Sequence, residues 1–270
     1  MIRIWGGIIL GKCKVGLALG AGGAKGLAHL GVLDVLEKAN IPIHFIAGSS
    51  IGAVIGSFYA AGTRLDLLIK LAQELKNNYL IDFCISKMGL IKGKKAEAII
   101  RLMTHNKNFK DLNIPLAVVA TDLITGERVV FREGNVAQAV RASIAVPGVF
   151  QPVIKGDKIL VDGAVIDHLP AQIVREMGAD LVIAVDLQYY NSVVEARINN
   201  IFDVIMQSIE IIERNTREKY LPYTDIVIKP KVSNYPWTDF EAAEEIIIAG
   251  KVACEEVLDE IKLKMNSLKG

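Results

Sequence analysis

The sequence has few of the side chains that hold metal ions or build disulfide frameworks. Its 270 residues include only three cysteines and four histidines. Cys13, Cys84 and Cys254 are scattered, odd in number and form no CxxC pair, which excludes a disulfide framework and gives no sign of a zinc site. We therefore expect neither a metal nor a cofactor, and the plain thiols fit a reducing cytoplasm.

Neither sign of charge dominates, and no apolar run is long enough to cross a bilayer. The 31 basic and 30 acidic residues leave a net charge of +1, so nucleic-acid binding has no electrostatic support at the level of the whole chain. The apolar start, 1–10, is shorter than the roughly 20 residues of a spanning helix and lacks a small-residue cleavage site. We expect a cytoplasmic protein with no signal peptide there.

Internal repeats, low-complexity segments and Pro/Gly/Ser linkers are also missing, which favours a single domain. Hydrophobic residues make up 51% of the chain, and the mean hydropathy is +0.35. These values exclude disorder and fit either a buried parallel sheet or some exposed apolar surface near a lipid site.

Short β runs alternate with amphipathic helical patterns, which is typical of a mostly parallel sheet covered on both faces. The expected strands are 15–19, 43–47, 116–120, 128–131, 158–161, 181–186 and 225–228. The expected helices are 25–39, 51–61, 65–72, 94–103, 136–142, 170–177, 201–220 and 241–265.

Gly48-Ser49-Ser50-Ile51-Gly52 lies between a β run and a helical pattern, which is the context of a GxSxG nucleophile elbow. The turn is so tight that a side chain at Gly48 or Gly52 would collide with the neighbouring backbone. Ser50 would then stand at a helix N-terminus, where the helix dipole favours a developing negative charge. A glycine-rich turn with an ordinary capping serine fits the same residues.

A second strand-to-helix turn, 20–26, is rich in glycine. Small residues let a ligand approach the backbone, and the amides of Gly22 and Gly23 would form an anion site at a helix N-terminus. The anion could be a dinucleotide pyrophosphate or the oxyanion of acyl transfer. The spacing is not a strict GxGxxG, and the acidic ribose ligand expected about 20 residues further on is missing. A structural turn without a ligand is the other interpretation.

The third segment is Asp162-Gly163-Ala164, which follows the expected strand 158–161. We expect the carboxylate to lie at the same edge of the sheet as the two turns, where open α/β sheets bind ligands. Alone, Asp-Gly is a common turn. Together, the three segments supply an anion site, a nucleophile and a base.

The order and spacing of these segments resemble the patatin-like phospholipase family, whose relatives include the esterase domain of neuropathy target esterase. The resemblance extends over nearly the whole chain, through 27–33, 120–126, 141–148 and 237–240. Ala21 stands where the family often has a glycine, and Ala164 where its motif is often DGG. Both residues are small, so we expect a working site.

The resemblance implies a three-layer α/β/α sandwich with a mostly parallel sheet. It implies one patatin-like hydrolase domain over 1–270, with a catalytic core at about 14–187 and C-terminal helices and a strand at about 196–266 packed on it. It also implies hydrolysis of lipid carboxylic esters by a Ser-Asp dyad through an acyl-enzyme. By position, Ser50 matches the nucleophile, Asp162 the general base, and Gly22 and Gly23 the oxyanion-hole glycines. Supporting positions of the motifs are Gly20, Lys25, Gly26, Gly48, Gly52, Gly163 and Ala164.

The chemistry of such a dyad also follows from the residues themselves. Ser50 is a poor nucleophile until a base takes its proton, and a carboxylate with an ordinary pKa of about 4 is a weak base at neutral pH. Burial raises that pKa and strengthens the amide dipoles that meet an oxyanion. The dyad therefore requires a dry, apolar pocket, which suits a fatty-acyl substrate.

Several other polar residues have less support. His168 completes the order Ser, Asp, His, but it follows Asp162 by only six residues, so we expect it to cap a helix or lie at the surface. Lys25 could bind a phosphate headgroup or brace its loop through an ion pair. Ser49 and Ser143 lack the elbow context, and we expect them to be structural.

The segment 77–93 has no clean period and is a candidate lid. A basic run, 87–110, overlaps it beside the apolar residues 79–83. This run is either a solvated face or a peripheral contact with an anionic membrane surface.

Two functions remain open: a hydrolase acting on a lipid or acyl ester, and a catalytically silent lipid-binding or regulatory module. The three intact motifs favour the hydrolase. A dinucleotide-dependent oxidoreductase is a distant third. Phospholipids, lysophospholipids, simple esters and thioesters all fit the hydrolase, as does acyl transfer to an acceptor other than water.

Overall fold

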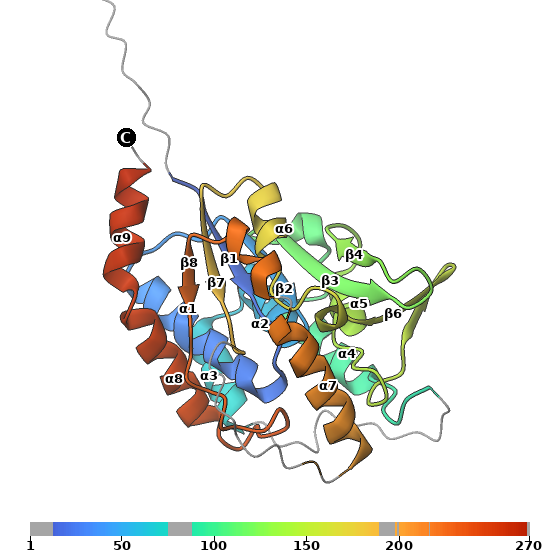
Figure 1. The fold of residues 1–270 in the computed structure, drawn as a ribbon. Coiled ribbons are helices and arrows are strands. Elements are labelled where there is room, and N and C mark those ends of the chain that lie inside the picture. The colour runs from blue at the N-terminus through green and yellow to red at the C-terminus, as the bar shows by residue number, and fades with distance from the viewer. Residues whose placement is uncertain (1–12, 75–87, 189–197, 199, 216, 269–270) are drawn as a thin grey trace, which may run out of the picture.

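Eight strands form one sheet in the computed structural model, which describes residues 13–74, 88–188, 198, 200–215 and 217–268 (Figure 1). The strands are β1 (Val15–Leu19), β2 (Phe45–Ser49), β3 (Leu116–Asp122), β4 (Arg128–Phe131), β5 (Val153–Lys155), β6 (Lys158–Asp162), β7 (Leu181–Val185) and β8 (Ile226–Ile228). Followed from one hydrogen-bonded neighbour to the next, they run β5-β6-β3-β2-β1-β7-β8, with β4 also paired to β3. The pairings among β3, β2, β1, β7 and β8 are parallel, whereas β4 and β6 run antiparallel to β3, and β5 antiparallel to β6. The expected mostly parallel α/β class is confirmed.

Helices cover both faces of this sheet. They are α1 (Ala28–Lys38), α2 (Ile51–Ala60), α3 (Leu65–Glu74), α4 (Lys94–Met103), α5 (Val136–Ser143), α6 (Ala171–Glu176), α7 (Ile201–Asn215), α8 (Ala243–Glu255) and α9 (Leu258–Ser267). The expected helix 25–39 instead opens with the 3-10 turn η1 (Gly23–Leu27), and 201–220 is helical only to Asn215 before short 3-10 turns. The expected helix 241–265 is two helices. One helix was expected because the apolar spacing continues across the break between α8 and α9.

The period-two alternation of the strands divides the core in two. Leu17 and Leu19 of β1 face the larger cluster, which packs against α1, α2, α5 and α8. Ala18 of β1 faces the smaller cluster under α6, where small residues let the helix approach closely. A β-carbon at Gly16 would lie only 2.2 Å from Cγ1 of Val174 in α6. The site therefore stands on a sheet whose centre is packed from both sides.

Two expectations fall largely outside the described residues. They are the apolar start 1–10 and residues 77–87 of the candidate lid, which include the apolar 79–83. Across the described ranges, we find no helix with the length and apolarity needed to traverse a bilayer.

Candidate active site

Ser50 occupies the turn between β2 and α2 in a backbone conformation that side chains seldom adopt, with φ 52° and ψ −124°. A β-carbon at Gly48 would lie 2.5 Å from the amide nitrogen of Ala53, and one at Gly52 would lie 2.2 Å from the carbonyl oxygen of Leu19. The two glycines thus let the turn pass close to its neighbours, as the motif predicts. Strain of this kind persists only where the surroundings hold it, and it is common at active sites.

The hydroxyl oxygen of Ser143, at the end of α5, accepts a hydrogen bond of 2.9 Å from the backbone N–H of Ser50. Ser143 is buried, so this bond is protected from water. Ser143, which we expected to be structural, thus supports the strained backbone of the elbow itself.

Asp162 reaches Ser50 through strand register. Val118 and Val119 of β3 pair with both β2 and β4, so β2 and β4 lie on opposite edges of β3. Further along β3, Ala120 and Thr121 pair with both β4 and β6. The strand β6 therefore lies on the same edge of β3 as β2, and it pairs with β3 beyond the point where β2 ends. Because Ser49 is level with Val119 and Asp162 with Ala120, β6 ends where the elbow begins.

The direction of β6 differs from the direction that we expected. We expected Asp162 at the shared carboxyl edge of parallel strands, but β6 runs antiparallel to β3 and approaches Ser50 from the opposite direction. Asp162 lies next to Ser50, but the expected strand direction was wrong, because the alternation pattern carries no information on strand direction.

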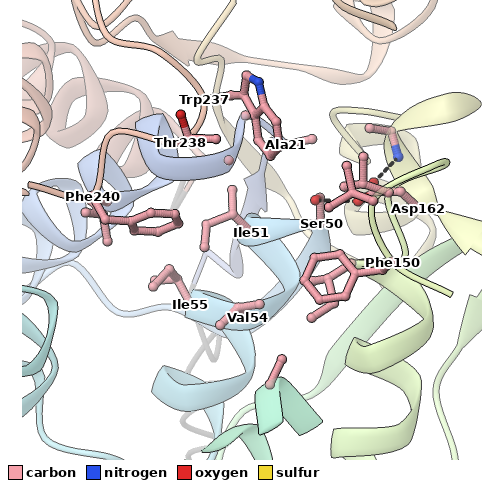
Figure 2. A pocket seen from close by; sticks show the side chains of 18 of the residues that line it. Ala21, Ser50, Ile51, Val54, Ile55, Phe150, Asp162, Trp237, Thr238 and Phe240 are labelled. Carbon is pink, nitrogen blue, oxygen red and sulfur yellow. Dashed lines mark hydrogen bonds between the residues drawn. The ribbon is translucent and has the colours of Figure 1, made fainter. Parts of the chain in front are cut away.

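The side chains of Ser50 and Asp162 point toward one another (Figure 2). The Ser50 hydroxyl donates to Oδ2 of Asp162 at 2.6 Å, and the backbone N–H of Ala164 donates to Oδ1 at 2.9 Å. Gly163 permits this approach, since a β-carbon there would lie 2.5 Å from the carbonyl oxygen of Val119. Each carboxylate oxygen therefore has a donor, and one of the two donors is the Ser50 hydroxyl.

Burial controls the protonation of this carboxyl group. Asp162 is 2% exposed, and desolvation raises its pKa from 3.8 to about 7, against the opposing hydrogen bonds from Ser50 and Ala164. A carboxyl group with that pKa is partly ionised at neutral pH and can accept a proton from an alcohol far better than an ordinary aspartate can.

The glycine loop lies between β1 and α1, with the amides of Gly20, Ala21 and Ala24 bound to carbonyl groups of other segments. Among the described hydrogen bonds, none is donated by the amides of Gly22 and Gly23, which line the same cavity as Ser50. These two amides are thus available to an oxyanion.

Trp237 and His29 hold this loop from two sides. Gly23 has a φ of 58°, and a β-carbon there would lie 2.4 Å from the carbonyl oxygen of Trp237, which also accepts the Ala24 N–H at 2.7 Å. Nε2 of buried His29 lies 2.8 Å from the carbonyl oxygen of Gly20. Burial lowers the pKa of His29 to about 4, so the ring is neutral and donates this bond. This role of His29 could not be predicted from the sequence, because an isolated histidine carries no motif signal.

Lys25 makes an ion pair. Its ammonium group lies 2.8 Å from Oε1 of Glu210 in α7, and Lys25 is only 4% exposed. Of the two roles expected for Lys25, the structure shows the brace: the charge ties the glycine loop to α7. Gly26 also fits the loop closely, since a β-carbon there would lie 2.2 Å from Cγ2 of Ile51.

A cavity of about 380 Å³ opens beside the Ser50 hydroxyl. Its lining is mainly apolar and aromatic, with side chains from α2, α3, α4 and α7 and from the segment 237–240 (Figure 2). Glu210 and Glu213 of α7 are also part of the lining. Burial, reinforced by nearby Glu210 and Asp162, raises the pKa of Glu213 well above its ordinary value. Because most of the lining is apolar, an acyl chain can extend from Ser50 into an apolar space.

His168 lies elsewhere. It is buried, with its ring edge-on to Tyr220 at 5.4 Å between centroids, and its backbone carbonyl oxygen accepts the Ala21 N–H at 2.9 Å. It is not among the residues that line the cavity with Ser50. Both placements expected for it were wrong, since His168 is buried and the N-cap of α6 is Pro170, with no side-chain cap hydrogen bond. The imidazole therefore does not stand between Ser50 and Asp162, which bond directly.

The chain is similar in sequence to a known protein family. The family model "Patatin-like phospholipase" matches residues 17–175, more than half of the chain. An uncharacterized NTE family protein of Mycobacterium tuberculosis is 42% identical over 177 residues, which is 64% of this chain and 49% of that protein. Patatin-like phospholipase domain-containing protein 6 of Mus musculus is 33% identical over 181 residues, 64% of this chain and 13% of that protein. This chain thus spans half or less of the length of these relatives.

Two solved structures share the fold. VipD from Legionella pneumophila superposes with a TM-score of 0.65 at 15% identity, covering 93% of this chain and 67% of that one. The type III effector protein ExoU superposes with a TM-score of 0.54 at 13% identity, covering 93% and 53%. At these identities the likeness concerns the fold alone.

Proposed function

The chain belongs to the patatin-like phospholipase family, and we propose that it is a serine acyl hydrolase that cleaves carboxylic esters of lipids through a Ser50–Asp162 dyad. The observation that carries the proposal is the 2.6 Å hydrogen bond from the Ser50 hydroxyl to the buried Asp162 carboxylate, beside an apolar cavity. A nucleophile bonded to its base is the arrangement that covalent catalysis requires.

In the first half of the reaction, Asp162 accepts the Ser50 proton while Oγ attacks the ester carbonyl carbon. The oxyanion of the tetrahedral intermediate is bound by the amides of Gly22 and Gly23. The intermediate then collapses, the bond to the leaving oxygen breaks, and the alcohol departs with the proton from Asp162. The product is an acyl-Ser50 ester.

In the second half, water attacks the acyl carbonyl carbon and Asp162 accepts its proton. Collapse releases the fatty acid, and Asp162 returns the proton to Oγ of Ser50. Only the ionised carboxylate can begin either half. With the pKa of Asp162 raised to about 7, the rate should therefore rise with pH through this region on the acid side of the profile.

The substrate class follows from the cavity wall. The apolar lining favours a fatty-acyl group, and a dry wall also sustains the raised pKa of Asp162. We propose that residues 1–270 act as one hydrolase domain, since β8 joins the same sheet as β1 and segment 237–240 helps to line the cavity. We place its activity in the cytoplasm, at the surface of a membrane.

Labelling with a fluorophosphonate tests the dyad and separates it from a catalytically silent lipid-binding module. We expect the tag on Ser50 alone, because Ser50 is the serine bonded to a base in the cavity, whereas buried Ser49 lies within β2. Ser50→Ala should abolish labelling and ester hydrolysis with an unchanged circular dichroism spectrum. A folded wild-type protein that takes no label, or a tag on Ser49 or Ser143, would refute the assignment.

A further inference from the structure

Helix α7 has one side toward the cavity and an apolar side toward solvent. Glu210 and Glu213 line the cavity together with Met206 and Ile209. Side chains exposed by 44 to 63% follow one another at helical spacing on the other side of α7: Ile201, Val204, Ile211 and Ile212. A helix on the surface of a soluble protein normally turns polar side chains to the water. The outward side of α7 is therefore an apolar surface that a water-facing role does not explain.

The ion pair between Lys25 and Glu210 holds α7 in this orientation. The two charged groups are 2.8 Å apart, and Lys25 is almost fully buried. Rotating α7 to bury its isoleucines would withdraw Glu210 and leave a buried ammonium group without its partner, which is costly. The ion pair on the cavity side of α7 thus keeps the outward isoleucines exposed.

A second exposed apolar segment lies next to α7. Met88 and Leu90 are 54% and 41% exposed, and the Leu90 N–H donates to the carbonyl oxygen of Val149 at 3.0 Å. The neighbouring Gly148 lies against α7, since a β-carbon there would be 2.9 Å from Cδ1 of Ile205. The segment around Leu90, through Ile91, and helix α7 also contribute to the cavity wall. We call the exposed side chains of the two segments the apolar rim: Met88, Leu90, Ile201, Val204, Ile211 and Ile212.

Basic residues adjoin the apolar rim. Lys92, Lys94 and Lys95 follow Leu90 within five residues of the sequence, and all three are exposed. Apolar side chains flanked by lysines match the interface of an anionic bilayer, where the hydrocarbon boundary takes the former and the lipid headgroups attract the latter.

We propose that the apolar rim and these three lysines dock the protein on an anionic lipid bilayer, so that the catalytic cavity lies next to its substrates. A symmetric contact with a second copy would juxtapose the same patch from both chains and bring like charges together, which disfavours it. The choice of a bilayer rests on the proposed lipid substrate, but docking itself does not require the dyad.

Flotation with vesicles tests the docking surface. The proteins carry Ser50→Ala, so that hydrolysis cannot alter the vesicles, which contain phosphatidylcholine with or without phosphatidylserine. Ile201→Gln combined with Ile212→Gln should weaken binding to the anionic vesicles at least about tenfold, because two partly exposed isoleucines lose their burial in lipid. Lys92→Glu should weaken binding to anionic vesicles and leave binding to neutral ones unchanged. The matched control is Val252→Gln with Leu263→Gln, 46% and 70% exposed on α8 and α9, which should bind like the parent.

Hydrolysis of a soluble short-chain aryl ester, measured with Ser50 intact, should be the same with and without the isoleucine substitutions. Unchanged vesicle binding in the isoleucine variant, or an equal loss in the control, overturns the docking surface. So does a dimer, found by sedimentation, that these isoleucine substitutions dissociate. If the wild type hydrolyses no soluble ester while binding still depends on the apolar rim, the proposed function fails and the docking surface stands.

Discussion

Replacing Asp162 by asparagine should destroy activity and stabilise the fold at alkaline pH. The amide has nearly the same shape as the carboxylate. Its oxygen can accept the Ala164 N–H, and its NH₂ group can donate to the Ser50 hydroxyl oxygen, so both contacts of the carboxylate can be replaced. What disappears is a buried group that ionises. Because that group is the base, kcat should fall by about 10²- to 10⁴-fold.

The effect on stability follows from the shifted pKa. Asp162 has a pKa of about 7 in the folded protein, against 3.8 as its ordinary value, so between these two pH values the folded state binds the extra proton. The free energy of unfolding therefore falls as pH rises through this window. For a shift of this size, Asp162 should cost the wild type about 2 to 3 kcal/mol between about pH 5 and pH 8. Asp162→Asn should be free of that loss.

Urea unfolding at several pH values, followed by circular dichroism, measures the difference between the two proteins. Glu213 also has a raised pKa, to which the charge of Asp162 contributes, so the difference reports the titration of Asp162 together with its coupling to Glu213. The control is Asp157→Asn, the same substitution at an exposed carboxylate in the turn between β5 and β6. A wild-type minus Asp162→Asn difference that does not change with pH, or a variant less stable than wild type at pH 8, would show that burial does not control this carboxyl group.

Two further substitutions separate catalytic from supporting residues. His168→Ala should keep kcat within about tenfold of wild type and leave the acid limb of the pH–rate profile near pH 7, because the ring lies outside the cavity; a loss as severe as that of Ser50→Ala would indicate a triad. Ser143→Ala should lower kcat roughly tenfold to a hundredfold with little change in KM, because it leaves the Ser50 N–H without its acceptor. Buried Ser57, whose hydroxyl donates to the carbonyl oxygen of Val54 in α2, provides the matched Ser→Ala control, and an equal loss there would refute a specific role for Ser143.

Local sequence patterns were sufficient for the fold class and for the residues around the nucleophile. The elbow could be predicted because its glycines are required by contacts within a few residues, such as the approach of Gly48 to Ala53. The strand 15–19 and the helix 94–103 were placed correctly because periodicity and length agree there. Helix boundaries were less accurate where a pattern continued through a change of geometry, as at Gly23–Leu27 and between α8 and α9.

Supports that depend on distant partners were not predictable. Ser143 and Ser50 are 93 residues apart, and Lys25 and Glu210 are 185 apart, so no local spacing marks either pair. Strand direction was hidden for the same reason: whether β6 runs parallel or antiparallel to β3 depends on the path of the connection between them, not on the apolar pattern of 158–162. The sequence could therefore indicate that Asp162 lies near Ser50 without indicating the direction of the strand that carries it.

The antiparallel approach of β6 bears on why two residues could suffice. A triad places an imidazole between serine and carboxylate because the carboxylate is too far away to take the proton itself. Here the register ends β6 level with the elbow, and the resulting 2.6 Å contact leaves no space for a ring. A carboxylate in direct contact must then carry the basicity that an imidazole has by nature, and burial at 2% exposure provides it by raising the pKa of Asp162 to about 7. The same burial lowers stability as pH rises, so the apolar wall around Ser50 is as much a part of the proposed base as the carboxyl group.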